Sequence, residues 1–168
     1  MKSKNIFALV AAIVICELAG VIGSVFTITA IPIWYAGLVK PPLNPPAWIF
    51  APVWTLLYLL MGVAVFLIFR AGEGKSGPES GRGAGPRRAA LFVFAFQLAL
   101  NVLWTALFFG LHSPVLGLIC IVALWLAIIW TMFAFHKISR PATYLLAPYL
   151  LWVTFAAYLN LAIFLLNR

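Results

Sequence analysis

The chain has 168 residues and a net charge of +8, and 65% of its residues are hydrophobic while only 8% are charged. A soluble globular domain carries about 25% charged residues, so this composition excludes a water-facing surface, and its hydrophobicity excludes an intrinsically disordered chain. The basic residues lie between apolar runs, where topology and anionic lipid headgroups explain them better than nucleic acid does, so we expect an integral membrane protein with lipids and no nucleic acid as partners.

Five apolar runs follow one another along the chain, and each is long enough, at about 1.5 Å per residue, to cross a hydrocarbon core of about 30 Å. Backbone groups in lipid are satisfied only in helices or closed barrels, and these runs lack the alternation of barrel strands. The sequence therefore predicts an all-α integral membrane protein, with residues 1–168 forming a single five-transmembrane-helix bundle. The expected helices are residues 5–27, 47–69, 89–110, 115–135 and 142–166.

The first run contains one acidic residue, Glu17, and no site of small residues ends it cleanly, so we interpret it as a retained helix rather than a signal peptide. No span holds a Lys or Arg to pair with Glu17, which indicates a protonated side chain or one that faces a hydrated interior. The functional alternative is that Glu17 takes part in proton coupling. A Pro-rich loop precedes the second run, and the Gly-rich residues 70–88 are typical of a flexible linker without chemistry.

The basic residues divide unequally between the two sides that five spans define. Under the positive-inside rule the richer side is cytoplasmic, which predicts a cytoplasmic N-terminus in a multi-pass protein of a prokaryotic cell membrane. The poorer side has only Lys40 and Arg168, whereas the richer side carries nine residues, Lys2, Lys4, Arg70, Lys75, Arg82, Arg87, Arg88, Lys137 and Arg140.

Polar and aromatic side chains inside the spans mark the candidate site, because such residues are costly in lipid and commonly functional. Measured from the end that carries the Pro-rich loop, Trp54, Trp104 and Asn160 lie about 10 Å below the helix ends. Asn101 lies about 14 Å down and Trp152 about 20 Å down. The first four of these residues come from three helices and converge on one level, with Trp152 below them, which predicts a ligand pocket with aromatic walls and a few orienting polar groups.

Two simpler interpretations compete with the pocket. Asn and Gln in membrane spans often only join helices through hydrogen bonds, and tryptophans most often form belts at the membrane interface. We assign Trp48, Trp125 and Trp130 to such belts.

Enzymatic and metal-binding patterns are absent from the sequence, so we predict no catalytic residue, no metal site and no covalently bound cofactor. Cys16 and Cys120 lie inside apolar runs and are interpreted as reduced, buried side chains. His112 and His136 fall at helix ends, and a haem protein would place His inside the spans.

Four segments in order resemble the family of tryptophan-rich sensory proteins and translocator proteins, once called peripheral-type benzodiazepine receptors. They are WYAGLVKP at residues 34–41, PPAWIFAPVWTLLY at residues 45–58, QLALNVLW at residues 97–104 and PYLLWVTFAAYLN at residues 148–160. The resemblance covers nearly the whole chain and implies a five-helix bundle, commonly a homodimer, with a ligand cavity closed by the loop between the first two helices.

Members of this family bind porphyrins such as protoporphyrin IX and synthetic benzodiazepine-type ligands, so the resemblance implies a porphyrin-binding membrane receptor or sensor. The alternatives are a transporter of porphyrins or lipophilic metabolites and a light-dependent porphyrin-degrading enzyme, for which Trp54 and Trp152 would be the photochemical residues. Sterol binding is not expected, because Leu161 stands where animal members carry a Tyr. The implied ligand-binding residues are Ser24, Thr27, Trp34, Ala51, Val53, Trp54, Asn101, Trp104, Trp152, Phe155, Ala156 and Leu159.

Overall fold

The computed structural model describes the backbone of residues 3–71 and 80–168 and the side chains of residues 3–71 and 85–168. Within that part of the chain all regular elements are helices, and five of them are long and apolar enough to cross a membrane. The predicted fold class, an all-α multi-pass membrane protein with five spans, is therefore confirmed. The spans are Ser3–Tyr35, Ala47–Arg70, Gly85–Gly110, Pro114–His136 and Arg140–Leu166.

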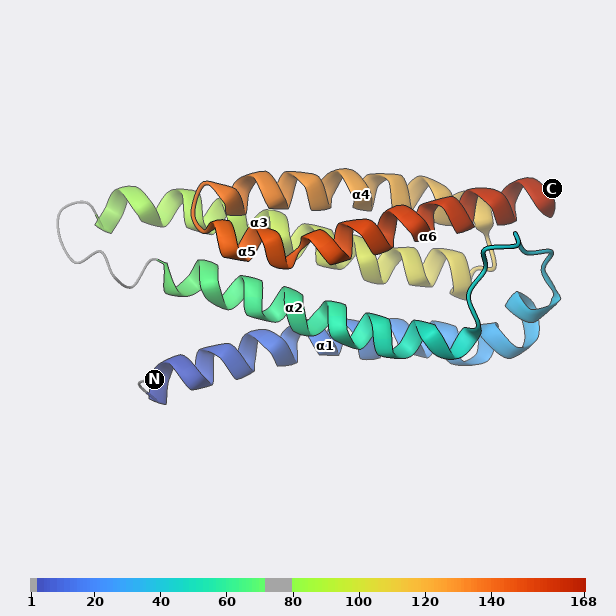
Figure 1. Ribbon diagram of the computed structural model, residues 1–168, viewed down its shortest axis with the longest axis horizontal. Helices are drawn as coiled ribbons and strands as arrows, with labels where there is room; N and C mark the ends of the chain where they lie inside the picture. Colours follow the sequence, from blue (N-terminus) through green and yellow to red (C-terminus); the bar gives the residue numbers. More distant parts are fainter. Residues whose placement is uncertain (1–2, 72–79) are drawn as a thin grey trace.

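The helices run side by side along the long axis of the molecule (Figure 1). Helix α1 (Ser3–Ala30) packs against α2 (Phe50–Arg70) and α3 (Ser80–Thr105), while α4 (Pro114–His136) packs against α3 and α6 (Ala147–Leu166). We call the end with residues 38–46 the loop end. The opposite end, where α2 and α4 finish, is the far end.

The first span is longer than predicted, because α1 continues into the π-helical turn η1 (Ile31–Tyr35). Pro32 lies at the start of this wide turn, where a residue without an N–H is accommodated as the hydrogen-bond pattern changes. Trp34 therefore lies on a helical extension and not in the loop that the sequence predicted for it. A short 3-10 turn, η2 (Ala47–Ile49), then leads into α2.

The predicted flexible linker at residues 70–88 is partly helical, because α3 begins at Ser80. Extending an existing helix adds about one hydrogen bond per ordered residue, so a packed helix can propagate into a Gly-rich segment. Arg87 anchors this end of α3 by donating from Nη1 to the carbonyl oxygen of Phe69, at 3.3 Å. Residues 72–79 of the predicted linker lie outside the described part of the chain.

The third and fifth spans also depart from simple α-helices. Span three ends in a second π-helical turn, η3 (Ala106–Gly110), and His112 then adopts a positive φ of 51° before α4 begins. Span five is broken at Leu146 into α5 (Arg140–Leu145) and α6. Pro148 explains the break, since proline lacks the N–H that would bond to the carbonyl four residues earlier.

The far half of the bundle is closely packed. Met61, Ala64 and Ile68 on α2 are fully buried, and Phe135 on α4 stacks on Phe94 with ring centroids 5.9 Å apart. Gly62 allows the backbones of α1 and α2 to meet, because a Cβ there would lie 2.5 Å from Ile13 Cα. Small residues commonly permit this close approach between membrane helices.

Candidate functional site

A cavity of about 540 Å³ lies between α1, α2 and α3 in the loop half of the bundle. Ligand pockets commonly measure about 300–1,000 Å³, so this one has room for a sizeable molecule. Most of its wall is apolar or aromatic, with a few hydroxyl groups, one carboxamide and one acid. The lining residues are Glu17, Gly20, Val21, Gly23, Ser24, Thr27, Ile28, Ile31, Pro32, Tyr35, Ala47, Phe50, Ala51, Trp54, Thr55, Tyr58, Asn101, Trp104, Thr105 and Phe109.

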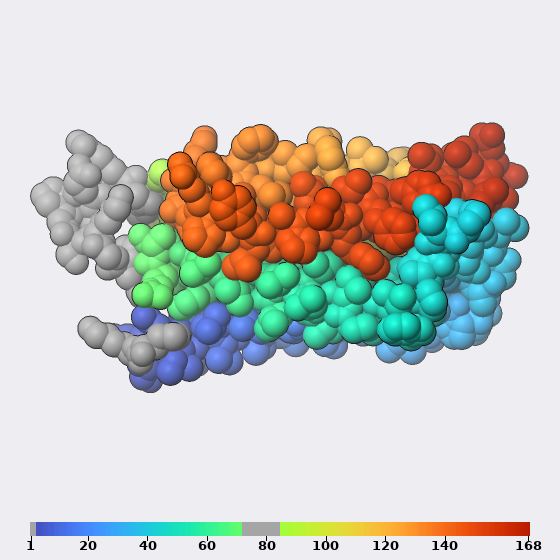
Figure 2. Space-filling model, in the orientation of Figure 1, coloured from blue at the N-terminus to red at the C-terminus, as the bar shows by residue number. Residues whose placement is uncertain are grey.

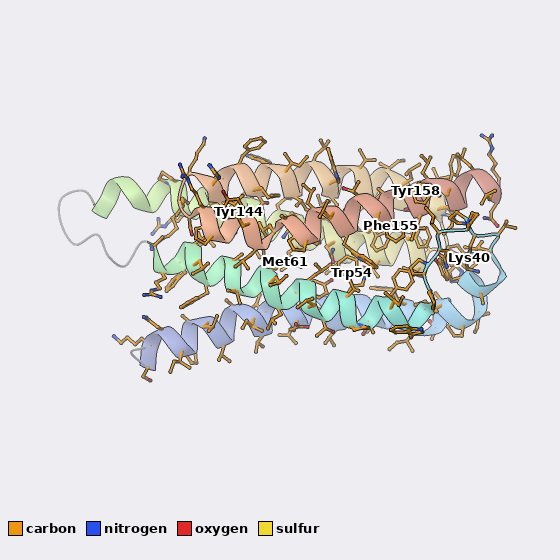
Figure 3. The ribbon with its side chains drawn as sticks, in the orientation of Figure 1. Lys40, Trp54, Met61, Tyr144, Phe155 and Tyr158 are labelled. Atoms are coloured by element: carbon orange, nitrogen blue, oxygen red, sulfur yellow. The ribbon has the colours of Figure 1, made fainter. Side chains whose placement is uncertain are left out.

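Trp54 is the central aromatic residue of the cavity. Its ring lies 5.6 Å from that of Tyr58 and 6.3 Å from that of Trp104, with small angles between the ring planes in both pairs. Figure 3 shows it on α2, deep in the bundle from the loop end. The indole N–H makes no hydrogen bond to the described residues, and the side chain is only half-buried. Trp54 therefore offers the cavity an aromatic ring.

Tyr58 and Asn101 belong to a buried chain of hydrogen bonds that ties α2, α3 and α6 together. Tyr58 donates to Asn101 Oδ1 at 2.5 Å, Asn101 Nδ2 donates to the Tyr149 hydroxyl at 3.1 Å, and that hydroxyl donates to Gln97 Oε1 at 2.9 Å. Gln97 Nε2 in turn lies 3.9 Å from Met61 Sδ. The network holds one wall of the cavity in place, and the Asn101 amide that lines it already has two protein partners.

Trp104 connects the cavity to the helices behind it. Its indole N–H donates to Asn160 Oδ1 at 3.2 Å, and Asn160 Nδ2 donates to the carbonyl oxygen of Pro114 at 2.8 Å. Asn160 therefore stands behind Trp104 and does not line the cavity. Of the residues predicted at one level, Trp54, Trp104 and Asn101 share the cavity wall, while Asn160 supports it.

The residues predicted for ligand binding divide into two groups of equal size. Six of them line the cavity: Ser24, Thr27, Ala51, Trp54, Asn101 and Trp104. The other six lie outside its lining: Trp34, Val53, Trp152, Phe155, Ala156 and Leu159. Ligand contact by either group stays a prediction, and the structure reports only where the side chains lie.

Trp34 and Trp152 are the two tryptophans in the outer group. Trp34 stacks on His112 with ring centroids 4.8 Å apart and packs edge-on against Phe108 at 5.4 Å, so it braces η1 against the turn before α4. Trp152 packs edge-on against Phe50 at 6.0 Å, and its buried Nε1 has no hydrogen-bond partner in the described part of the chain. Because Phe50 lines the cavity, Trp152 supports that wall from α6.

A long strip of α1 faces the cavity, and only Ser24 and Thr27 of it were among the predicted ligand-binding residues; Glu17 and Gly20 were not. Steps of three and four residues along α1 were the available signal, since they put side chains on one helix face. Gly20 and Ser24 are small residues four positions apart, a pattern that commonly permits close approach of membrane helices. Instead, Gly20 makes room for an aromatic ring, because a Cβ there would lie 2.5 Å from Tyr58 Cε2.

The prediction for the interfacial tryptophans was wrong at Trp125. It lies midway along α4, between Pro114 and His136, and donates from Nε1 to Thr154 Oγ1 of α6 at 2.8 Å. Its polar atom is therefore satisfied between two helices and not at a membrane surface. Trp48 and Trp130 are 73% and 58% exposed, as expected for residues outside the protein core.

The loop that follows η1 is fastened to the end of α6. The Val39 N–H donates to Asn167 Oδ1 at 2.9 Å, and Asn167 Nδ2 donates back to the Val39 carbonyl oxygen at 2.9 Å. The Tyr35 hydroxyl also donates to Asn44 Oδ1 at 2.5 Å. Figure 2 shows the loop atoms seated against the C-terminal helix at this end.

The cavity lining suits the binding of a ligand through apolar and aromatic contacts. In residues 3–71 and 80–168 no group of three His, Cys, Asp or Glu side chains could hold a metal ion. The aromatic rings offer flat faces for stacking, and the hydroxyl groups of Ser24 and Thr27 donate to carbonyl oxygens of their own helix. The geometry suits a flat, largely apolar molecule.

Several known proteins are similar to this chain over most of its length. A profile of the TspO/MBR family matches residues 12–166. The chain is 44% identical over 165 residues to the tryptophan-rich protein TspO of Chlorobaculum tepidum, covering 98% of this chain and 99% of that one. It is 44% identical over 163 residues to the protein of the same name in Archaeoglobus fulgidus, covering 97% and 99%. The bovine translocator protein is 39% identical over 127 residues, covering 76% and 70%.

Proposed function

This chain belongs to the TspO/MBR family of membrane proteins, and on that premise we propose that it is a receptor or sensor that binds porphyrins, such as protoporphyrin IX, in the cavity between α1, α2 and α3. The observation that carries the proposal is the position of Trp54, with its ring exposed to the cavity and close to two other aromatic rings. A porphyrin is a flat aromatic macrocycle, and offset stacking on indole faces is the contact that such a molecule favours.

The size and rigidity of the cavity support the same function. Its volume of about 540 Å³ falls within the range of small-molecule sites. The hydrogen-bonded chain from Tyr58 to Gln97 holds one wall before any ligand arrives, which reduces the ordering cost of binding.

The close contact of α1 and α2 below the cavity favours a receptor over a transporter. Below the cavity, α1 and α2 meet at Gly62 and Ile13 with no room even for a Cβ. A transporter would need this contact to open during each cycle. A vesicle flux assay with protoporphyrin separates the two functions, because a receptor binds the porphyrin without moving it across the bilayer.

A titration of the purified protein with protoporphyrin IX, followed by porphyrin absorbance, tests binding directly. We expect saturable binding in the parent and about tenfold weaker binding in Trp54→Ala, because the stacking surface is lost. Trp130→Ala is the matched control, since this indole is exposed on α4 and away from the cavity. Equal affinity in the parent and in both variants would contradict the site.

The same titration separates the two groups of predicted residues. Trp152→Ala removes a residue that backs Phe50 and does not line the cavity, so we expect a smaller loss of affinity than for Trp54→Ala. Repeating the absorbance series in light and in darkness tests porphyrin degradation, which would appear as loss of the porphyrin band over time only under illumination.

A further inference from the structure

A second hollow continues the ligand cavity toward the loop end. It has a volume of about 440 Å³ and shares Ile31, Tyr35 and Ala47 with the first cavity. Its other lining residues are Ala36, Lys40, Asn44, Pro45 and Pro46. The two hollows therefore adjoin along η1, and we call the second, which carries one basic side chain, the mouth. Figure 3 shows Lys40 at the loop end and Trp54 farther into the bundle.

Lys40 is held in place without being neutralised. Its Nζ donates to the carbonyl oxygens of Ala36 at 3.0 Å and Leu38 at 3.1 Å, and it lies 5.0 Å from the centre of the Tyr35 ring. An ammonium group has three donors, so one remains for a ligand. The only acidic side chains of the sequence are Glu17, in the first span, and Glu73 and Glu79, which follow the far end of α2. In the described part of the chain, no acidic side chain lines the hollow that contains Lys40.

The inner end of the cavity has the opposite character. Glu17 is the only acidic residue that lines it, and it lies about 27 Å from Tyr35 along α1 at the helical rise. Between Glu17 and Lys40 the lining carries no charged side chain. The cavity thus has a basic mouth, an apolar and aromatic middle, and an acidic inner end.

We propose that this arrangement selects lipophilic acids and binds them in one orientation, with a carboxylate against Lys40 and the apolar body against Trp54. The inference rests on the proposed function of the cavity as a ligand site. A carboxylate at the mouth meets an ammonium in partly hydrated surroundings, where it keeps some of its solvent. In the reverse orientation it meets another carboxyl group in the middle of the membrane, where an unpaired charge is costly.

The test compares protoporphyrin IX, which has two carboxylates, with its dimethyl ester, which has the same macrocycle and no charge. Binding of both is measured in neutral detergent for the parent, Lys40→Gln and Lys40→Arg. We expect the parent to bind the acid about five- to tenfold more tightly than the ester. Lys40→Gln abolishes this preference by weakening the acid alone, and Lys40→Arg keeps most of it because the charge remains.

Arg168→Gln is the matched control, since it removes the other basic side chain of the loop end, and Arg168 lines neither hollow. Its acid preference should equal that of the parent. An equal drop in Arg168→Gln would mean that general surface charge, and not Lys40, attracts the acid.

The outcomes separate this inference from the proposed function. If the parent binds neither porphyrin, the proposed function fails and the inference falls with it. If the parent binds the acid and the ester equally, or if Lys40→Gln weakens binding of the two equally, the cavity is a porphyrin site but Lys40 does not recognise the carboxylate. If Lys40→Gln matters only after anionic lipid is added, Lys40 binds lipid headgroups and the inference is overturned.

Discussion

The same pair of helices, α1 and α2, meets closely at Gly62 and leaves a cavity beside Gly20. In the far half, the missing side chain of Gly62 lets Ile13 reach the α2 backbone, with 2.5 Å from the position of a Cβ to Ile13 Cα. In the loop half, the Tyr58 ring occupies the space that a side chain at Gly20 would take, and the cavity lies next to this ring. Two glycines in one interface thus make room for different neighbours, a helix backbone at Gly62 and an aromatic ring at Gly20.

The difference teaches how a membrane protein makes a cavity. Lipid is as apolar as the helix surfaces, so no hydrophobic effect draws helices together within the bilayer, and close packing depends on shape. At Gly62 the small residue faces the backbone of α1, and the two helices meet there. At Gly20 the small residue faces an aromatic ring that lines the cavity. The position of Tyr58 relative to Gly20 therefore matters as much to the cavity as Trp54 does.

Adding a side chain at Gly62 should have the largest effect on stability. Gly62→Ala places a Cβ against the Ile13 backbone, which cannot move as a flexible side chain would, and we expect a loss of about 2–3 kcal/mol in the free energy of unfolding. Unfolding in detergent micelles measures it. Gly37→Ala is the control, because nothing lies within 4 Å of a Cβ there. Similar stabilities in the two variants would remove the contrast between the halves.

Breaking the hydrogen-bonded wall of the cavity should cost less. Tyr149→Phe leaves Asn101 Nδ2 and Gln97 Oε1 without their shared partner, and we expect a loss of about 1–2 kcal/mol by the same unfolding assay. Tyr144→Phe removes a hydroxyl from a side chain that is 67% exposed and should change little. If both variants unfold like the parent, the network is not holding the wall.

Filling the open half should reduce ligand affinity while leaving the fold intact. Ser24→Leu adds an apolar side chain to the cavity wall, and we expect protoporphyrin affinity to fall about tenfold, equivalent to about 1.4 kcal/mol. The adjacent substitution Val25→Leu adds volume to a side chain that does not line the cavity, so it should bind like the parent. Undiminished binding in Ser24→Leu would place the ligand elsewhere.

Releasing the loop from α6 should have the smallest effect. Asn167→Ala removes the paired hydrogen bonds to Val39, and because they are exposed we expect at most about 1 kcal/mol of lost stability. The loop should then open more often and release bound porphyrin several-fold faster, which stopped-flow displacement measures. An unchanged release rate would show that the loop does not control exit from the cavity.

Much of this architecture was predictable because membrane insertion depends on local composition. Runs of apolar residues specify spans whatever their neighbours are, so the number and type of helices followed from the sequence. Trp54, Trp104 and Asn101 were predicted together from depth, because residues at one level on facing helices meet whenever those faces turn inward. The family resemblance followed from motifs that are equally local.

The direction in which each helix face turns was decided only by the tertiary structure. Every apolar helix face is about equally stable in contact with lipid, so the sequence alone does not say which side of a span faces the protein interior. The rotation of each helix about its axis follows from packing against its neighbours. The contact of Gly62 with Ile13 turns the Glu17 and Ser24 face of α1 toward α2 and α3. The break before Pro148 directs α6, so that Trp152 supports the cavity from behind Phe50 and Trp125 finds its partner in Thr154.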